Sequence, residues 1–412
     1  MTYHKRTTCR VCGNSDLKLF LELGPTPLAN SFLKSSDEFK NENIYPLDLY
    51  FCGNCSLVQL LDVIDPEVLF RHYVYVSGTS ETMETHNEEY AQTIVNFLEL
   101  GSDDLVLEVA SNDGSLLKYF KKYKVKILGI EPATNIAEIA QESGIDTLNE
   151  FFNSVTATRI KNNYGPAKVI IGNNVLAHID NTQDFLNGCK DILADEGMAV
   201  FEVPYIRELL NRLEYDTIYH EHLCYFSITS LVHLCDEVGL SVVRVDHLPI
   251  HGGSLRIYAG DKKYYPHHGD EVIIKVQSEQ HAGMTNQAYY ERFAANVEHN
   301  RQVLLNLLKT LQAEGKTLAA YGAPAKGNTL LNYCGVGTDI IPYTVDKNPL
   351  KVGQYTPGMH IPVLEVSTLL ERQPDYILIL AWNFAEEIMH QQKEYHDRGG
   401  KFIIPIPEPK VI

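Results

Sequence analysis

Short apolar runs, each followed by small or polar residues, recur through the middle of the chain. The first is Leu105-Val-Leu-Glu-Val109, which leads through the turn Ala110-Ser-Asn-Asp-Gly114 into a helical stretch over 115–123. A second run, Ile127-Leu-Gly-Ile130, ends on the acidic residue Glu131. An apolar strand, a small-residue turn, a helix and a second strand ending in a carboxylate are typical of the opening of a nucleotide-binding α/β unit.

The same alternation of strands and helices continues towards residue 262. Helical stretches such as 182–192 and 229–237 separate further strand candidates, which are 168–172, 198–203, 241–245 and 254–258. This rhythm predicts a doubly wound, mainly parallel sheet. Too few residues separate the last two strands for a helical crossover, so we expect them to form an antiparallel hairpin at the edge of the sheet.

A second α/β set follows from about residue 264. Apolar residues keep helical spacing over 289–315, and a helix is expected from Ala325. The strand candidates of this set are 317–323, 340–346, 376–381 and 402–405. The turn Tyr321-Gly-Ala-Pro-Ala-Lys-Gly-Asn328 combines small residues, one lysine and a helix N-terminus, which favours an anion cradle. The expected fold is therefore a Rossmann-like C-terminal domain.

Two C-x-x-C pairs stand in the N-terminal part, at Cys9, Cys12, Cys52 and Cys55. Each pair can close a tight turn that presents two thiolates to one ion, and two such turns complete a tetrahedral Cys₄ site. A redox role is the alternative, but no thioredoxin-like βαβ pattern surrounds either pair. We therefore predict a structural zinc ion, and expect the four other cysteines to be small buried hydrophobic residues.

Composition narrows the functional classes. The 412 residues allow two or three domains, and 44% hydrophobic with 21% charged residues is ordinary for a globular protein. The net charge of −18 argues against a nucleic-acid-binding surface, because phosphate neutralisation needs clustered Lys and Arg. No apolar run reaches the length of a membrane span and the polar start is no signal peptide, so the expected location is the cytoplasm.

The segment Tyr219-His-Glu-His222 carries the most reactive side chains. A metal site is one interpretation, but on a helix the two histidines point apart, and on a strand Glu221 faces away from both. Acid–base chemistry is the other, because an imidazole titrates near neutrality beside a tyrosine and a carboxylate. His178 follows another strand at its carboxyl end, where open α/β sheets bind ligands. We expect four strand exits to meet in one crevice, namely 110–114, 173–178, 203–205 and 219–222.

Seven motifs occur here in a fixed order: tandem C-x-x-C pairs, S-G-T-S, E-V-A-S-N-D-G, N-N-V-L-A-H, Y-H-E-H-L-C-Y-F-S, H-G-G-S-L-R and Y-G-A-P-A-K-G-N. Together they resemble the sugar C-methyltransferase family, which methylates nucleotide-linked 4-keto-deoxysugars at C3. The resemblance implies a zinc-binding domain over 1–66, a class I S-adenosylmethionine (SAM) methyltransferase domain with a seven-stranded sheet over 67–262, and a Rossmann-like domain over 263–412. It also implies a nucleotide-sugar site between the last two domains.

The resemblance further implies roles for single residues. His222 matches the base that removes the proton beside the ketone. Tyr219 and Glu221 are implied at the sugar, where they stabilise the enolate oxygen or orient the imidazole. His178 is implied in the same pocket.

Cofactor and substrate residues are implied in the same way. Glu131 is expected to hold the ribose of SAM. The full cofactor-binding set is Tyr75, Ser80, Glu108, Ala110, Asn112, Glu131, Asn173 and Asn174. The substrate-binding set is Tyr75, His178, Ser254, Arg256, Tyr321, Lys326 and Asn328, of which Lys326, Asn328, Ser254 and Arg256 are the candidates for the diphosphate. Tyr73 is an alternative to Tyr75 in the pocket.

Two other functions are compatible with parts of this pattern. One is a SAM-dependent O- or N-methyltransferase of a nucleotide sugar, and the other is a non-catalytic nucleotide-sugar binding protein. The intact Y-H-E-H segment argues against pure binding, because a binder needs no base. The expected partner is a dTDP- or GDP-linked keto-deoxysugar, with no nucleic acid or membrane, and the expected assembly is a monomer or weak dimer.

Overall fold

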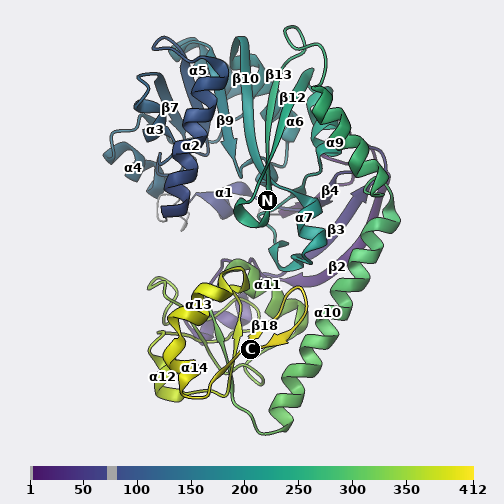
Figure 1. Cartoon of the computed structure of the whole chain (residues 1–412), viewed down its shortest axis with the longest axis vertical. Coiled ribbons are helices and arrows are strands. Elements are labelled where there is room, and N and C mark those ends of the chain that lie inside the picture. Colours follow the sequence, from purple (N-terminus) through teal and green to yellow (C-terminus); the bar gives the residue numbers. More distant parts are fainter. Residues whose placement is uncertain (1–2, 72–80) are drawn as a thin grey trace. The chain divides into compact units, whose positions relative to one another are not determined.

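The computed structural model describes residues 3–71 and 81–412, which form two units (Figure 1). Unit 1 contains the described residues of 1–18, 51–206 and 223–286. Unit 2 contains 19–50, 207–222 and 287–412. The expected domains were continuous in sequence, whereas each unit here gathers separate segments, and the Y-H-E-H segment is in unit 2.

The large sheet of unit 1 has seven strands in the order β12-β13-β10-β9-β6-β7-β8. The bounds of these strands, in chain order, are β6 Leu105–Val109, β7 Lys126–Ile130, β8 Thr147–Leu148, β9 Ala167–Asn173, β10 Leu193–Pro204, β12 Leu240–Leu248 and β13 Ser254–Asp261. The five strands from β10 to β8 are parallel to their neighbours. Strand β13 is antiparallel to both β12 and β10. The predicted sheet and its terminal hairpin are therefore confirmed, with β13 inserted between β12 and β10.

Helices cover both faces of this sheet, because its buried strands alternate apolar side chains between two cores. Helices α2 (Glu81–Leu98) and α3 (Leu117–Lys121) pack with Val106, Ile171 and Val200 in one cluster. On the other face, Phe201 of β10 packs against Phe185 of α6 (Thr182–Ile192), with 6.0 Å between ring centroids. The remaining helices that lie entirely in unit 1 are α1 Pro66–Phe70, α4 Thr134–Glu142, α5 Ser154–Tyr164, α8 Ile228–Glu237 and α9 Asp270–His281.

The N-terminal part adds short strands to both units. In unit 1, β1 (Tyr3–Lys5) pairs with β5 (Asp62–Ile64), and β4 (Val58–Leu60) pairs with β11 (Cys224–Tyr225), both antiparallel. Strands β2 (Leu17–Thr26) and β3 (Tyr45–Cys52) lie mostly in unit 2, so the stretch between the two C-x-x-C pairs is folded, as predicted.

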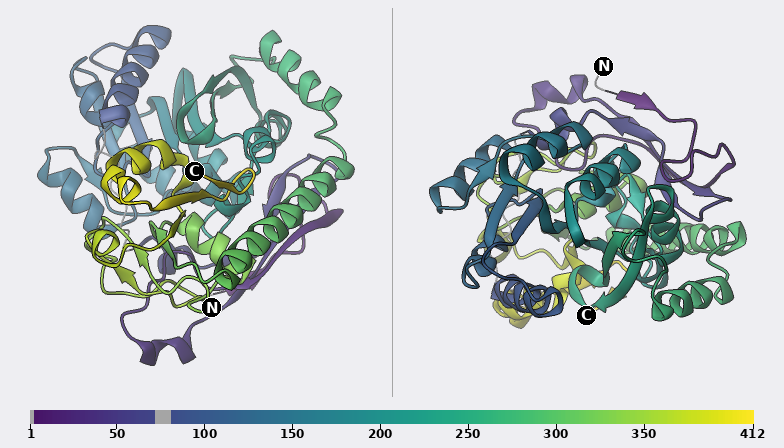
Figure 2. Two further views of the ribbon diagram at one scale, coloured as in Figure 1. Left: turned by 60° about the horizontal axis from the view of Figure 1, so that its bottom comes forward. Right: turned by 90° about the horizontal axis from the view of Figure 1, so that it is seen from above.

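Unit 2 contains a six-stranded sheet in the order β16-β15-β14-β17-β18-β19, in which only β19 is antiparallel to its neighbour. The strand bounds are β14 Leu318–Tyr321, β15 Thr344–Val345, β16 Val363–Leu364, β17 Tyr376–Ile379, β18 Lys401–Ile404 and β19 Lys410–Val411. The helix bounds are α10 Gln287–Ala313, α11 Ala325–Cys334, α12 Thr368–Arg372, α13 Ala385–Gln391 and α14 Lys393–Asp397. Helix α10 is the long green helix in Figures 1 and 2. Helix α7 (Ile206–Asn211) begins in unit 1 and continues into unit 2.

Several predicted elements are shorter than the sequence suggested, among them the strands expected over 317–323 and 376–381. The strand expected over 340–346 is reduced to Thr344–Val345, because Pro342 has no backbone N–H for pairing. The helix expected over 115–123 is regular only over Leu117–Lys121. No helix of the described residues is long and apolar enough to cross a membrane.

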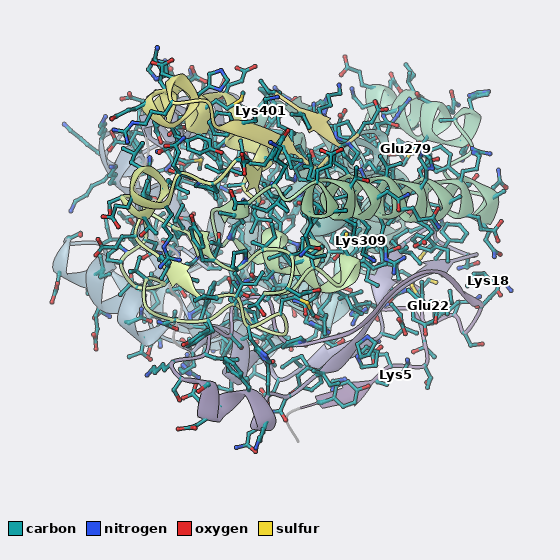
Figure 3. The ribbon with its side chains drawn as sticks, turned by 90° about the horizontal axis from the view of Figure 1, so that it is seen from below. Lys5, Lys18, Glu22, Glu279, Lys309 and Lys401 are labelled. Carbon is teal, nitrogen blue, oxygen red and sulfur yellow. The ribbon has the colours of Figure 1, made fainter. Side chains whose placement is uncertain are left out.

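A buried carboxylate joins two helices of unit 1. Glu279 of α9, labelled in Figure 3, has no exposed surface and accepts the backbone N–H groups of Ile228 and Thr229, each at 2.8 Å. These N–H groups belong to the first turn of α8 and have no partner within that helix. Glu279 also accepts the hydroxyl group of Tyr205 at 2.8 Å. This carboxylate therefore fixes the start of α8 beside the segment that follows β10.

Candidate functional site

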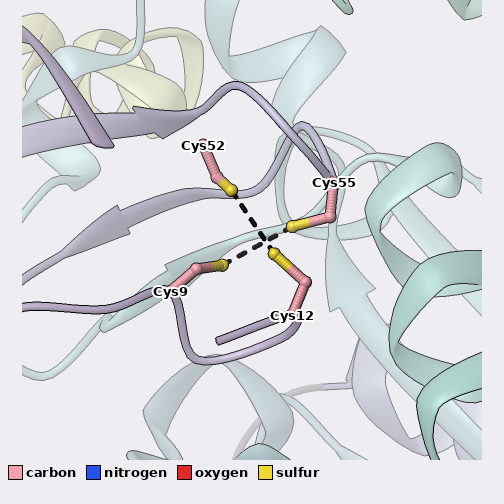
Figure 4. A group of neighbouring side chains, drawn as sticks. All are labelled: Cys9, Cys12, Cys52 and Cys55. Atoms are coloured by element: carbon pink, nitrogen blue, oxygen red, sulfur yellow. Dashed lines mark hydrogen bonds between the residues drawn. The ribbon is translucent and has the colours of Figure 1, made fainter. Parts of the chain in front are cut away.

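The four N-terminal cysteines form one cluster in unit 1 (Figure 4). The Sγ atoms of Cys9 and Cys55 are 3.5 Å apart, those of Cys12 and Cys52 are 3.6 Å apart, and all four lie within 4.8 Å of one another. A tetrahedral zinc ion with Zn–S bonds of about 2.3 Å separates its sulfur ligands by about 3.8 Å. The spacing fits a Cys₄ zinc site with no coordination position left for a substrate.

Arg10 ties this zinc site to the large sheet. Its side chain is 3% exposed, and its Nε lies 3.2 Å from Oδ1 of Asp180. The hydroxyl group of Thr182 donates to the Arg10 carbonyl at 3.2 Å. Asp180 and Thr182 follow directly after His178, so zinc binding supports the segment that carries this histidine.

The other four cysteines are buried and unpaired, as predicted. Burial raises the pKa of the Cys224, Cys235 and Cys334 thiols to about 12. Burial also places the pKa of the Cys189 thiol well above its usual value. These thiols therefore stay protonated and act as packing residues.

Strand β6 ends in a turn with an unusual backbone. Ala110, Asn112 and Gly114 all have positive φ, at 54°, 50° and 75°. The sequence departs from a glycine-rich fingerprint at Ala110 and Asn112, yet both residues adopt the conformation that glycine provides at lowest cost. At Gly114 a Cβ atom would lie 2.9 Å from the side chain of Ile145, so this position needs glycine. The turn follows the path of a nucleotide-binding loop without its usual sequence.

Glu131, at the end of β7, braces this turn. Its Oε2 accepts the N–H of Asn112 at 2.9 Å, and its Oε1 accepts the N–H of Ala133 at 2.8 Å. Burial raises the pKa of Glu131, and the two backbone N–H groups oppose that rise. Each carboxylate oxygen has a second lone pair, so the group fits a ribose diol while it holds the turn.

Unit 2 repeats this arrangement at the end of β14. Oδ2 of Asp346 accepts the N–H of Ala323 at 2.6 Å, and Oδ1 accepts the N–H of Asn348 at 2.8 Å. The N–H of Gly322 donates to the Val345 carbonyl at 2.7 Å, just as Ser111 donates to Ile130 at 3.1 Å in unit 1. Both units therefore present a strand, a tight turn and a helix, with an acid from the next strand fixing the turn.

The carboxyl ends of β6, β9 and β10 lie at the same edge of the sheet in unit 1, because these strands are parallel neighbours. This confirms that three of the four expected exits, 110–114, 173–178 and 203–205, share one rim. The fourth, 219–222, belongs to unit 2. Asn173 accepts a hydrogen bond from the Tyr90 hydroxyl group at 3.3 Å, and the N–H of Asn174 donates to the Glu202 carbonyl at 2.8 Å.

Arg256, a predicted diphosphate ligand, is engaged inside unit 1. Its Nη2 lies 2.6 Å from Oε1 of Glu202, and its guanidinium carbon lies 3.8 Å from the ring centroid of Tyr90. Nε2 of His86 is 3.1 Å from the second oxygen of Glu202. Burial raises the pKa of Glu202, but His86 and Arg256 outweigh burial and hold this pKa below its usual value. Ser254 is fully buried and its hydroxyl group donates to the Ile250 carbonyl. A diphosphate role for these two residues stays a prediction.

Two further predicted site residues in unit 1 are Glu108 and His178. Burial places the pKa of Glu108, a predicted cofactor residue, well above its usual value, and the nearby carboxylates of Asp113, Glu131 and Glu202 act in the same direction. His178 ends a short 3₁₀ helix (Leu176–His178) and packs edge-on against Phe70, with 5.4 Å between ring centroids.

Tyr219 to His222 form a turn, because the N–H of His222 donates to the Tyr219 carbonyl at 2.9 Å. The segment therefore adopts neither of the two conformations considered for it, a helix or a strand. Nδ1 of His222 lies 3.0 Å from the carbonyl oxygen of Thr217, and the rings of Tyr219 and His222 are 4.2 Å apart. A carbonyl oxygen only accepts, so Nδ1 carries the proton and the lone pair of the neutral ring is on Nε2.

His220 and Glu221 point to different partners. Nε2 of His220 donates to the Pro46 carbonyl at 3.0 Å, and Asn30 donates to Oε1 of Glu221 at 2.6 Å. Burial raises the pKa of Glu221, and Asn30 opposes that rise. Among the described residues, the four cysteines are the only group of His, Cys, Asp or Glu with the spacing of a metal site.

Lys326 lies in the first turn of α11 in unit 2. Its Nζ is 4.5 Å from the ring centroid of Trp382, and burial lowers its pKa while Asp216 and Glu214 oppose this. Burial raises the pKa of Asp216 to about 6 and that of Glu214 to about 7. Lys326 is therefore a half-buried cation among carboxylates.

Two neighbours of Lys326 in the predicted substrate set also lie in unit 2. Tyr321 is buried at the end of β14, and burial raises its pKa. The side-chain amide of Asn328 donates to the Ala29 carbonyl at 2.7 Å. The predicted residues Tyr73, Tyr75 and Ser80 lie outside the described residues.

Sequence reasoning did not assign roles to Glu202, Asp216 or Trp382. Glu202 was detectable as a lone acid within the apolar run Met198-Ala-Val-Phe-Glu-Val203, and Trp382 as the single tryptophan of the chain. Asp216 carried no comparable signal, because it lies in a polar loop whose contacts come from residues more than a hundred positions away.

Three family models match successive parts of the chain. Residues 9–70 match a zinc binding domain, 83–245 a methyltransferase domain, and 249–407 a domain described as the C-methyltransferase C-terminal domain. The matches follow the order of the motifs along the sequence.

Two curated proteins are similar to this chain. C-methyltransferase NovU of Streptomyces niveus is 38% identical over 404 residues, which is 98% of this chain and 96% of that protein. An uncharacterized methyltransferase of Oceanobacillus iheyensis is 30% identical over 131 residues, or 31% of this chain and 58% of that protein. Among solved structures, magnesium protoporphyrin IX methyltransferase from Synechocystis PCC 6803 with bound SAM is 11% identical. It covers 44% of this chain and 82% of its own length, with a TM-score of 0.33, which is too low to support an argument.

The Cys₄ site leads to a prediction about stability. We expect about one tightly bound zinc ion per chain, and Cys52→Ser should lower both zinc content and the thermal unfolding midpoint, because a structural site contributes folding free energy. Metal analysis and thermal unfolding measure these two quantities. Cys235→Ala, which removes a buried thiol outside the cluster, should keep the zinc. Purified protein without zinc, or Cys52→Ser with full zinc content, would contradict the assignment.

Proposed function

This chain belongs to the C-methyltransferase family and is a SAM-dependent C-methyltransferase with a structural zinc site, and we propose that its substrate is a nucleotide-linked 4-keto-6-deoxysugar methylated at C3. The single observation that carries the proposal is the environment of His222, where a carbonyl oxygen fixes the proton on Nδ1. The lone pair of Nε2 is then oriented to remove a carbon-bound proton.

The reaction follows from the chemistry of a ketone. A C–H bond next to a carbonyl group is acidified, so an imidazole removes the C3 proton and leaves an enolate. When bound, SAM supplies a methyl group on a positively charged sulfur atom. The C3–CH₃ bond forms as the S–CH₃ bond breaks, and the bond electrons remain on sulfur. The imidazolium of His222 then returns its proton to solvent.

Three other residues are proposed to assist at the sugar. The Tyr219 ring lies against His222, so its hydroxyl group is the candidate donor to the enolate oxygen. Glu221 is held by Asn30 and is proposed to orient the turn. His178 is proposed to contact the sugar.

The cofactor residues are proposed at the end of β6 and its neighbours. The carboxylate of Glu131 accepts hydrogen bonds from the ribose diol, and the positive-φ turn brings backbone close to the amino acid part of the cofactor. Asn112, Asn173 and Asn174 are proposed around the remaining polar groups. Their positions at the carboxyl ends of parallel strands support this role.

The diphosphate is proposed to bind at the start of α11. Lys326 supplies a cation at a helix N-terminus, where backbone N–H groups also favour an anion. Burial lowers the pKa of Lys326, and the carboxylates of Asp216 and Glu214 oppose this shift without cancelling it. A diphosphate would stabilise the ammonium form.

The test of the substrate is mass spectrometry after incubation with SAM and a panel of dTDP- and GDP-linked 4-keto-6-deoxysugars. We expect a mass increase of one methyl group on carbon, with loss of the C3 hydrogen in the product's NMR spectrum. A methyl group on oxygen or nitrogen would contradict C-methylation. Binding of the sugars without any methyl transfer would favour a non-catalytic role.

Glu131→Ala should weaken SAM binding, because charge-assisted hydrogen bonds to the ribose are lost, on the order of 1.5–3 kcal/mol. Isothermal titration calorimetry measures this. The matched control is Asp346→Ala, which removes the corresponding acid of unit 2 and should leave SAM affinity unchanged. NAD binding without SAM binding, or a larger loss with Asp346→Ala, would contradict the assignment of the cofactor site.

His222→Asn should leave SAM and sugar binding nearly intact and lower turnover by roughly 10²–10⁴, as expected for a lost general base. Steady-state kinetics and binding measurements separate the two effects. Tyr219→Phe should cost less if it supports only the enolate oxygen, and His220→Asn should also cost less, since His220 is bound to Pro46. Near-normal turnover of His222→Asn, with turnover lost in His178→Asn or Glu221→Gln, would place the base elsewhere.

A further inference from the structure

The carbonyl group that orients His222 belongs to a short 3₁₀ turn in unit 2, Tyr215–Thr217. This turn is followed by Ile218 and by the turn that carries the base. The orientation of the imidazole therefore depends on how firmly Tyr215–Thr217 is held. His222 itself does not hold it, because a single hydrogen bond to the Thr217 carbonyl restrains only the ring.

Helices α10 and α11 contribute one hydrogen bond each to this region. The hydroxyl group of Tyr215 donates to Oδ1 of Asn300 at 2.9 Å, and the hydroxyl group of Thr329 donates to the Ile218 carbonyl at 3.2 Å. These contacts fix the two ends of the segment. The middle residue, Asp216, is fully buried and is held from a different element.

Asp216 is bound by the indole of Trp382, which begins a short 3₁₀ helix before α13. Nε1–H of Trp382 donates to Oδ2 of Asp216 at 2.6 Å. Burial raises the pKa of Asp216 to about 6, and Lys326, Trp382 and the N–H groups of Asp216 and Thr217 oppose that rise. The indole thus holds the side chain of the residue directly before Thr217, whose carbonyl orients the base and whose own N–H donates to the Glu214 carbonyl at 3.1 Å.

We propose that Asp216, bound by Trp382, is a positioning residue that keeps the Thr217 carbonyl hydrogen-bonded to Nδ1 of His222. This hydrogen bond fixes the His222 tautomer that has its lone pair on Nε2. This inference rests on the proposed function of His222 as the base. Neither Asp216 nor Trp382 needs to touch the substrate. A partner that fixes the tautomer of a functional histidine commonly changes activity by about 10–100-fold when it is removed, and the wrong tautomer is inactive as a base.

The test uses the full-length zinc-bound protein and the variants Trp382→Phe and Asp216→Asn. Phenylalanine keeps a ring beside Lys326 but removes the N–H donor, and asparagine keeps the shape of Asp216 but removes its charge. We expect turnover to fall about 10–100-fold in each, with the KM values for SAM and sugar nearly unchanged. Tyr395→Phe is the matched control, because it removes a buried hydrogen bond of unit 2, to the Pro374 carbonyl at 2.9 Å, far along the chain from this turn.

The tautomer of His222 is the decisive readout, since loss of general stability alone does not change it. In protein labelled with ¹⁵N-histidine, the His222 signal is assigned by its loss in His222→Asn, at a pH where the ring is neutral. Wild type and Tyr395→Phe should show the Nδ1–H form, and the two variants a mixture. Trp382 is the single tryptophan, so its fluorescence in Asp216→Asn shows whether the indole stays in place.

The outcomes separate this proposal from the proposed function. The tautomer is measured without substrate, so it tests the positioning role even if no sugar in the panel is methylated. A mixed tautomer with reduced turnover supports the proposal. An unchanged Nδ1–H form in both variants overturns it, whatever the turnover, and so does a mixed tautomer with normal turnover.

Discussion

Carboxylates that accept backbone N–H groups hold the turns at the ends of β6 and β14. Glu131 receives the N–H groups of Asn112 and Ala133, and Asp346 receives those of Ala323 and Asn348. A buried carboxylate without such donors would be destabilised by desolvation, and buried N–H groups without an acceptor would carry a comparable penalty. The carboxylate supplies the acceptor that the N–H groups need, and the N–H groups supply the donors that the carboxylate needs. The acid and the turn are therefore fixed together.

Carboxylates also hold the segments beside the proposed cofactor site and the proposed base. In unit 1, Glu131 shapes the turn at the end of β6, where Ala110 and Asn112 take the backbone conformation that glycine would adopt at lower cost. The N–H of Asn112 donates to Glu131, which holds the turn in this conformation. In unit 2, Asp216 accepts the indole N–H of Trp382 beside the carbonyl that orients His222. A pre-oriented imidazole needs no reorganisation when the proton is removed.

The zinc site contributes to stability rather than to the chemistry of the reaction. Four thiolates and one ion would join the two C-x-x-C turns of the N-terminal part, which are about forty positions apart in the sequence. Arg10 lies between two of the zinc ligands and is bound to Asp180, two residues after His178. The metal therefore stabilises not only the N-terminal segment but also the segment that presents a predicted pocket residue.

Sequence alone determined the elements whose cause is local. Apolar runs with small-residue turns predicted the strands of both sheets and the terminal hairpin. Two C-x-x-C pairs predicted the zinc site. Both predictions succeed because side-chain periodicity and thiolate spacing are properties of neighbouring residues. Tertiary structure decided what depends on distant partners. It directed Arg256 to Glu202 and His220 to the Pro46 carbonyl. It also placed Trp382 on Asp216, 166 positions away. Hydrogen bonds between such remote residues satisfy buried polar groups, and no local pattern encodes which partner the fold will supply.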